Sequence, residues 1–213
     1  MSLNSRIIAV VFATSLEGED LPDRIGNHSV LALKTGVGLV NAAFSLTRFL
    51  TAHAVDAVVG CGVGGAYPGS DLEPGDVVCA ASETYGDLGA DSPTGFMDMR
   101  SLGFPVIDGA EPLFNELPLD LFPTARRVPF VTCAGCTGTD AMAKTLVART
   151  GGVVESMEGA AIVHVARLMG VKVGEVRGVS NPVGDRDRSK WRVREAAKAA
   201  RGAVIDWIEA GAC

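Results

Sequence analysis

The sequence lacks the features that would direct it to a nucleic acid or to an acidic membrane surface. It contains no polybasic block, and 19 lysines and arginines stand against 25 acidic residues, for a net charge of −6. Nucleic acids and anionic lipids select basic patches, so this balance argues against both as partners. The charge favours a small molecule as the partner.

The N-terminal segment lacks the marks of an export signal or a membrane anchor. Residues 1–6 carry no basic region followed by a long apolar stretch, and no small-residue cleavage site follows them. The apolar run at residues 7–14 is much too short to span a bilayer, which takes about 20 residues, and is typical of a buried strand. We therefore expect a cytoplasmic protein.

Histidine and cysteine are too sparse to predict a metal site or a disulfide framework. The 3 histidines are scattered, and the 5 cysteines form an odd number at irregular spacing. Cys133 and Cys136 form a lone C-x-x-C pair, whereas a zinc site needs about four ligands. A redox dithiol stays open, but small buried thiols at a strand end are the favoured interpretation. We expect reduced cysteines, no metal and no cofactor.

Short apolar runs alternate with glycine-rich turns and amphipathic stretches along the chain. The apolar runs predict strands at residues 7–13, 30–34, 54–60, 76–81, 129–133 and 171–180. Helical periodicity predicts helices at residues 41–54, 157–169 and 189–210. The glycine- and proline-punctuated residues 84–127 predict long loops. The length suits one domain over residues 1–213, and the pattern predicts α/β, a three-layer α/β/α domain around a mixed sheet.

The glycine-rich residues 60–65 satisfy the G-x-G-x-x-G pattern of dinucleotide sites and follow a predicted strand. Such a site needs a helix to begin there, so that the helix N-terminus faces the pyrophosphate. Here the chain continues into Tyr67-Pro68-Gly69, which cannot begin an ordinary helix. The absence of a helix after the pattern therefore argues against a dehydrogenase. The glycines still leave main-chain amides open to a ligand.

Three separate segments place polar residues at the ends of apolar runs, where open α/β sheets collect ligands. They are residues 15–19, 155–161 and 177–187. Residues 156–181, SMEGAAIVHVARLMGVKVGEVRGVSN, resemble the signature of the purine nucleoside phosphorylase and nucleosidase superfamily, and residues 60–78 resemble its glycine-rich loop and following strand. The resemblance covers nearly the whole chain in the right order. It implies a partly closed central sheet and an enzyme that cleaves an N-ribosidic bond.

Within that superfamily the chain looks most like the futalosine hydrolases. The resemblance lies in RGVSN (177–181), VGDRDRSKW (183–191), YGDLGA (85–90) and the short chain. It implies hydrolysis of futalosine to hypoxanthine and dehypoxanthine futalosine in menaquinone biosynthesis. The alternatives are a methylthioadenosine/adenosylhomocysteine-type nucleosidase and a non-catalytic nucleoside binder. The superfamily also implies a homo-oligomer, with Phe96 or Phe104 as candidates to enter a neighbour's pocket.

The resemblance assigns three catalytic residues. Glu158 matches the glutamate that binds the ribose hydroxyls, since a carboxylate can accept from both. Glu17 matches the glutamate that activates water, with Glu19 as the alternative in the same loop. Asn181 stands where adenine-specific nucleosidases carry aspartate. An amide can accept from N7–H and donate to a 6-oxo group, which favours hypoxanthine as the leaving base.

Further residues are assigned to substrate binding. Val63, Gly64 and Gly65 match the superfamily's loop at the sugar and base, Thr137 falls near its base-stacking segment, and Met157 precedes the ribose glutamate.

The segment after the last predicted strand and the loop after the first complete the prediction. Asp185 is also assigned to substrate binding, and Asp185 and solvent are the two candidate proton sources for the leaving base. Arg186 or Arg188 could bind the benzoate carboxylate of futalosine. Phosphorylases of the superfamily carry a Gly-Asp-Pro-x-x-Arg phosphate site after the first strand. Residues 13–20 are acidic there instead, which favours water over phosphate as the nucleophile.

Overall fold

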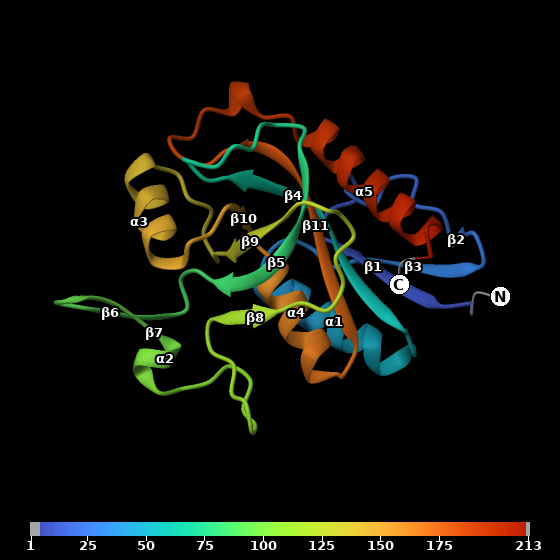
Figure 1. Cartoon of the computed structure of the whole chain (residues 1–213), viewed down its shortest axis with the longest axis horizontal. Helices are drawn as coiled ribbons and strands as arrows, with labels where there is room; N and C mark the ends of the chain where they lie inside the picture. Colours follow the sequence, from blue (N-terminus) through green and yellow to red (C-terminus); the bar gives the residue numbers. More distant parts are fainter. Residues whose placement is uncertain (1–4, 212–213) are drawn as a thin grey trace.

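A nine-stranded mixed sheet runs through the molecule in the computed structural model, which describes residues 5–211 (Figure 1). The strand order is β10-β9-β5-β11-β4-β1-β3-β2, and β8 pairs with β5 outside this path. The strands are β1 (Ile7–Phe12), β2 (Arg24–Ile25), β3 (His28–Lys34), β4 (Ala57–Ala66), β5 (Val77–Tyr85), β8 (Glu116–Pro118), β9 (Arg127–Thr132), β10 (Val154–Ser156) and β11 (Lys172–Pro182).

The sheet curls until it is partly closed. β10 ends the strand order, yet it also pairs with the far end of β4 through Val154–Ala66 and Glu155–Gly65. Glycine makes this approach possible, because a Cβ on Gly64 would lie 2.5 Å from a methyl of Val154. The mixed, partly closed sheet is confirmed.

The glycine-rich residues 60–65, expected as a loop, instead continue β4. Glycine keeps the hydrogen bonds of the backbone ladder while leaving space beside the strand.

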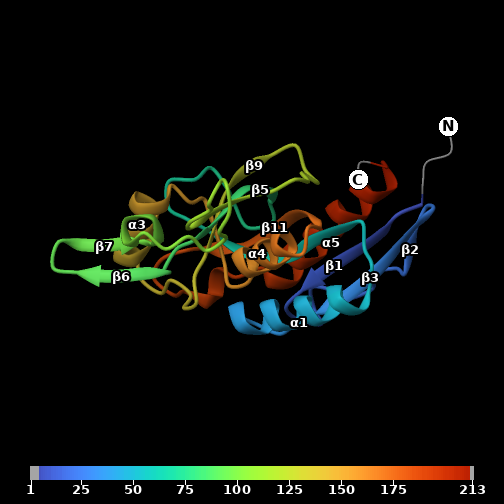
Figure 2. The ribbon, with the colours of Figure 1, turned by 90° about the horizontal axis from the view of Figure 1, so that it is seen from below.

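Helices cover both faces of the sheet. The helices α1 (Leu39–Ala52) and α4 (Gly159–Leu168) pack together on one face, and α5 (Val193–Glu209) lies on the other (Figures 1 and 2). Alternate residues of β1 serve the two layers: Val11 joins the cluster under α1 and α4, and Val10 joins the cluster under α5. A strand buried on both faces reads as a continuous apolar run. The three-layer arrangement is confirmed.

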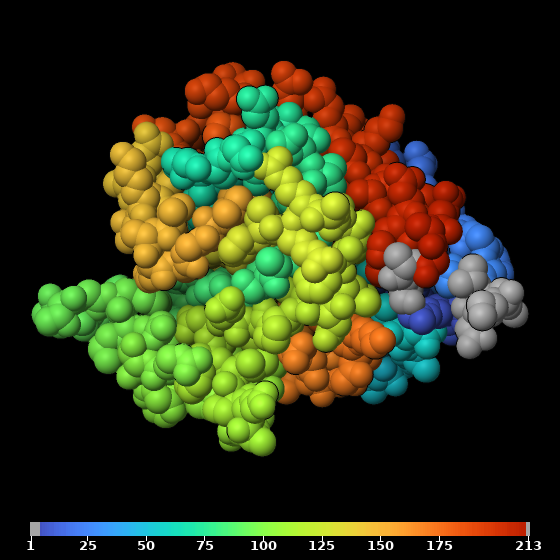
Figure 3. Space-filling model, in the orientation of Figure 1, coloured from blue at the N-terminus to red at the C-terminus, as the bar shows by residue number. Residues whose placement is uncertain are grey.

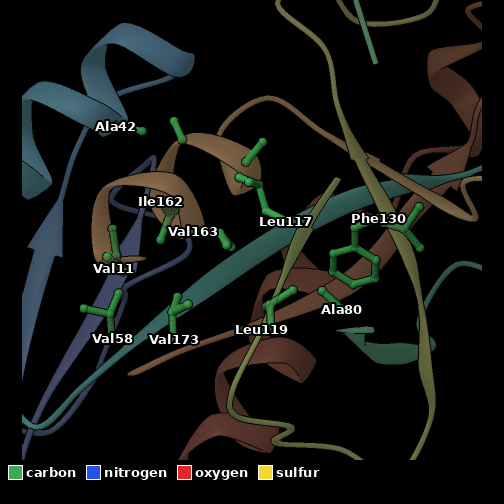
Figure 4. Packing of buried hydrophobic residues seen from close by; sticks show 14 of the residues in the cluster. Val11, Ala42, Val58, Ala80, Leu117, Leu119, Phe130, Ile162, Val163 and Val173 are labelled. Carbon is green, nitrogen blue, oxygen red and sulfur yellow. The ribbon is translucent and has the colours of Figure 1, made fainter. Parts of the chain in front are cut away.

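The core between the sheet and α4 is built from small and branched side chains. Figure 4 shows Val11, Val58 and Ile162 close together in this cluster, with Ala42 of α1 nearby. All four are buried, and full burial of a Val or Ile side chain contributes about 1.5–3 kcal/mol. This packing fixes the start of α4, where the Met-Glu segment lies.

Residues 84–127 are more regular than their glycine and proline content predicts. They form the hairpin of β6 (Gly89–Ser92) and β7 (Gly95–Asp98), followed by the short helix α2 (Met99–Leu102) and then β8. The hairpin projects from the body of the molecule (Figures 1 and 3). Its two-residue turn is closed by Ser92, whose hydroxyl donates to Gly95 O at 2.6 Å, and Gly95 has a positive φ of 125°. The expectation of long loops was wrong there.

A helix absent from the apolar pattern, α3 (Asp140–Thr150), covers the β9–β10 side of the sheet. Only Ala143 and Leu146 of this helix are buried, so its apolar stripe is too narrow to recognise. Its caps are clear: Thr139 accepts from the third amide of the helix, and Gly151 follows in the left-handed conformation.

Candidate functional site

A cleft of about 230 Å³ opens at the edge of the sheet where the parallel strands β1, β4 and β11 end. The loop after β1, the glycine-rich end of β4 and the end of β11 contribute to its lining, together with residues 155–158 at the start of α4. The carboxyl ends of neighbouring parallel strands form a common ligand-binding edge in α/β sheets. Three polar segments that are far apart in sequence therefore meet here.

Glu17 lies on the floor of the cleft and is 5% exposed. Its Oε2 accepts from the amide and hydroxyl of Thr14 at 2.8 and 2.9 Å, and its Oε1 accepts from the Val63 amide at 3.1 Å. These bonds hold the carboxylate in one orientation. A Cβ on Gly62 would lie 2.5 Å from both Glu17 Oε1 and Arg177 Nη1, so this glycine makes room for the two charged groups.

Glu19, the alternative water-activating residue, points elsewhere. It forms an ion pair with Arg194 at 3.2 Å, and the two side chains are 51% and 75% exposed. The structure therefore brings Glu17, and not Glu19, into the cleft.

Glu158 directly precedes α4 and is 5% exposed. Its Oε1 accepts from the Gly38 amide at 2.8 Å, and its Oε2 lies 3.8 Å from Arg177 Nη1. Burial raises the pKa of Glu158 above its usual value, and the nearby carboxylates of Glu17 and Glu175 add to this rise. Arg177 and the Gly38 amide act in the opposite direction. Because the contact of Oε2 with Arg177 is long, this oxygen is available to a ligand.

Arg177, on β11, is buried between these acidic groups and is 2% exposed. Its Nε donates to Glu175 Oε1 at 2.7 Å, and its Nη1 donates to the Val63 carbonyl at 3.3 Å. Burial lowers the pKa of Arg177, but Glu175, Glu158 and Glu17 more than offset this, so the pKa rises and the guanidinium stays charged.

Glu175 and Arg177 were not predicted to have a role at the site, although the sequence carries a signal for both. They stand two residues apart inside an otherwise apolar run, so they share one face of a buried strand. Charged residues are almost never fully buried unless they are paired.

A bulge in β11 presents the two polar residues at its end. The register with β4 shifts between Val179 and Asn181, which redirects the following side chains. Ser180 Oγ lies 2.7 Å from Asn181 Oδ1 and 3.1 Å from the Gly64 carbonyl, and Asn181 Nδ2 donates to the Pro182 carbonyl at 2.9 Å. Ser180 and Asn181 both line the cleft.

A further buried carboxylate, Glu155, stabilises the wall of the cleft that the loop after β9 forms, and it was missed as a functional residue. Its Oε1 accepts from the Thr137 amide at 2.9 Å, and its Oε2 accepts from the hydroxyls of Thr137 and Tyr67. These bonds fix the loop after β9, so that Thr137 and Cys136 line the cleft together with Met157. Val63, Gly64 and Gly65 also line it, as expected.

The two thiols of the C-x-x-C pair lie in different surroundings. Cys133 is buried, Cys136 is exposed, and neither is in a disulfide among the described residues. Burial raises the pKa of Cys133 to about 12, so its thiol stays protonated. Thiol–disulfide exchange needs a thiolate, which favours the structural interpretation.

Asp185 lies outside the cleft lining, contrary to its expected substrate-binding place. Its Oδ1 accepts from the Asp140 amide at 3.1 Å, while Asp140 Oδ1 accepts from the Asp185 amide at 3.0 Å. The Asp185 carboxylate therefore provides the acceptor for the first amide of α3, which has no partner within the helix. The structure does not bring Asp185 together with the other site residues.

Its neighbours do reach the cleft. Arg186 and Trp191 line the outer part, with the guanidinium 4.9 Å from the ring centroid. Arg188 lies 5.8 Å from the same ring, on its way into the short 3₁₀ helix η1 (Arg188–Lys190), and does not line the cleft. Phe96 lies 3.8 Å from the Arg149 guanidinium, and Phe104 is exposed; both are outside the cleft lining.

Within residues 5–211 no cluster of His, Cys, Asp and Glu has the arrangement to hold a metal ion. In the same range, no helix is both long and apolar enough to cross a membrane.

Comparisons with known proteins agree with this arrangement. The sequence profile of the phosphorylase superfamily matches residues 23–209. The futalosine hydrolase of Thermus thermophilus is 36% identical over 181 residues, covering 81% of this chain and 78% of the relative. That of Streptomyces coelicolor is 38% identical over 178 residues, covering 81% and 75%. The S-adenosylhomocysteine nucleosidase of Streptococcus pyogenes, solved with 5-methylthiotubericidin, shares the fold with a TM-score of 0.82 at 20% identity, covering 99% of both chains.

Proposed function

The chain belongs to the phosphorylase superfamily, and from this premise we propose that it is a futalosine hydrolase, which releases hypoxanthine and dehypoxanthine futalosine for menaquinone biosynthesis. The observation that carries the proposal is the buried carboxylate of Glu17 at the cleft floor, in the loop after β1. Phosphorylases of the superfamily bind phosphate in this loop. A carboxylate repels phosphate and can accept a proton from water, so the site favours hydrolysis.

Glu17 has the free acceptor capacity that this role requires. Each carboxylate oxygen can accept about two hydrogen bonds. Oε1 receives one from Val63, which leaves a lone pair for the attacking water. As the N-ribosidic bond breaks, water loses a proton to Glu17 and its oxygen bonds to the anomeric carbon. The bonding pair of the broken bond leaves with the base.

Glu158 is assigned to the ribose hydroxyls. Among residues 5–211 its Oε2 has only the distant contact with Arg177, so it can accept from both hydroxyls of a ribose placed above it. The sugar becomes oxocarbenium-like in the transition state, as in glycoside hydrolysis generally. Two carboxylates beneath it stabilise the developing positive charge more than they stabilise the neutral substrate.

Asn181 is assigned to the base. Its present bonds to Ser180 and Pro182 use one lone pair of Oδ1 and one hydrogen of Nδ2. The remaining lone pair can accept from N7–H of hypoxanthine, and the remaining hydrogen can donate to the 6-oxo group. Because Asp185 lies outside the cleft, water is the proton source that we propose for N7 of the leaving base.

The outer part of the cleft suits the benzoate end of futalosine. Trp191 offers an aromatic face, and Arg186 offers a guanidinium for the carboxylate. A ligand with an aromatic acid at this end would therefore gain contacts that inosine cannot make.

The deciding experiment follows base release by chromatography. Purified protein is incubated with futalosine, inosine or methylthioadenosine, each with and without inorganic phosphate. We expect hypoxanthine from futalosine at a rate independent of phosphate. Adenine release from methylthioadenosine in preference would assign the protein to the adenine nucleosidases, and base release that requires phosphate would make it a phosphorylase. No release from any of the three would support a nucleoside binder instead.

We also propose that the protein is a homo-oligomer. Neighbouring helices α1 and α4 carry an apolar face: Val40 is 82% exposed, and Phe44, Leu168 and Met169 are exposed beside it. Faces of this kind on a protein surface mark association sites. Light scattering during gel filtration should give a multiple of the 22.0 kDa chain mass, and Phe44→Glu should reduce it. A monomer mass for the unaltered protein would overturn this assignment.

A further inference from the structure

Two completely buried glutamates face each other behind the floor of the cleft. Glu83, on β5, and Glu175, on β11, are both 0% exposed. They converge on Gly159 at the start of α4, where an added Cβ would overlap Glu83 Oε1 and both Glu175 oxygens. Within the described part of the chain, Glu83 Oε1 and Glu175 Oε2 have no hydrogen-bond partner. The two bare oxygens thus lie next to each other in the interior.

One proton between these two oxygens would give each of them a partner. Two carboxylates this close in a buried site cannot both be ionised, because desolvation and mutual repulsion act together. An unpaired buried oxygen also costs more than a bonded one. Burial, then the charge of Glu175, raises the pKa of Glu83 well above its usual value, which agrees with this count of protons.

The neighbours of the pair identify the carrier of the proton. Glu175 Oε1 accepts a charge-assisted bond from Arg177 Nε at 2.7 Å, which favours its ionised form. Glu83 Oε2 accepts from the neutral hydroxyl of Thr132 at 2.9 Å. The negative charge therefore belongs on Glu175 and the proton on Glu83.

We propose that Glu83 and Glu175 share one proton, carried by Glu83, and that this acid pair positions Arg177 beneath the catalytic carboxylates. The positioning role rests on the proposed function, because Arg177 touches Glu158 and the Val63 carbonyl at the cleft floor. A fixed anion at Nε leaves Nη1 directed at the floor. The shared proton removes one negative charge from the group of carboxylates around the Arg177 guanidinium.

The protonation is tested by infrared spectroscopy, without reference to activity. At neutral pH the unaltered protein should show the carbonyl stretch of a protonated carboxylic acid, and Glu83→Gln should lose it. Glu209→Gln, the same change at an exposed position at the end of α5, should keep it. Absence of the band in the unaltered protein, or its persistence in Glu83→Gln, would overturn the proposal even if the enzyme hydrolyses futalosine as expected.

The positioning role is tested by comparing two glutamine variants. The amide of Glu83→Gln can donate to Glu175 as the protonated acid does, so we expect kcat within about threefold of the unaltered enzyme. Glu175→Gln removes the anion that orients Arg177, so we expect kcat to fall about tenfold or more with a smaller change in KM. A purely structural role predicts equal effects. Equal losses in the two variants, with both folded by circular dichroism, would contradict the assignment.

Discussion

The floor and the rim of the cleft are both charged, yet they hold charge in opposite ways. On the floor, Glu17 and Glu158, with Arg177 directly behind them, are at most 5% exposed, and each is fixed by hydrogen bonds with neighbouring strands and loops. On the rim, which comprises residues 185–194, charged side chains are exposed and pair with other exposed groups. Buried charges depend strongly on their partners, whereas exposed pairs contribute about 0–1 kcal/mol. In the proposed function, the floor carries the reaction and the rim meets the outer part of the substrate.

The largest effect on catalysis is expected from a change at Glu17, on the floor. Glu17→Gln keeps the shape of the side chain but cannot accept a proton from water, so kcat should fall about 10²- to 10⁴-fold. The matched change Glu19→Gln alters a carboxylate two residues away that lies outside the cleft, and should leave kcat within about twofold. Both are measured as hypoxanthine release from futalosine. If Glu19→Gln were the inactive variant, the assignment of the base would be reversed.

The next largest effect should be on stability, at Arg177. Arg177→Met leaves Glu175 buried without its partner, which should lower the free energy of unfolding by about 3–5 kcal/mol. Arg194→Met breaks the exposed pair with Glu19 and should cost at most about 1 kcal/mol. Urea titrations of the two variants give both values. Similar losses would show that the floor and the rim do not differ as their burial indicates.

The same contrast separates what the sequence could predict from what it could not. β1 and the first part of β4 were predictable because strands buried on both faces are continuous apolar runs, and β11 was predictable from its alternating pattern. The site segments follow from where these strands end. The partners of buried charges were not predictable, since the bond from Arg177 to the Val63 carbonyl joins residues 114 positions apart. The pairing of Asp185 with Asp140, 45 positions away, was not predictable for the same reason.

Local pattern also failed where few side chains are buried. The apolar content of α3 is low and its capping residues are its only strong signal, so the helix escaped a prediction based on periodicity. Asp185 accepts from the first amide of this helix, so the helix that periodicity missed also binds a carboxylate that was assigned to the site.

A smaller effect is expected at Asn181, between floor and rim. Asn181→Asp removes the amide hydrogens that the 6-oxo group would accept, so hypoxanthine release should slow about ten- to a hundredfold. The carboxylate can instead accept a bond from the amino group of adenine or share a proton with N7. Adenine release from methylthioadenosine should therefore increase. Unchanged ratios of kcat/KM for the two substrates would remove Asn181 from base recognition.

The smallest effect should lie on the rim, where Arg186 and Arg188 are matched residues that both lie close to the Trp191 ring. Arg186 lines the cleft and Arg188 does not. Arg186→Ala should raise KM for futalosine about tenfold, which is the effect of losing one charge-assisted bond in a partly exposed place. It should leave kcat unchanged, because the bond is equally strong in the ground state and the transition state. KM for inosine, which lacks the carboxylate, should not change, and Arg188→Ala should leave both values within about twofold. An equal rise in KM for both substrates would mean that Arg186 supports the cleft wall and not the benzoate group.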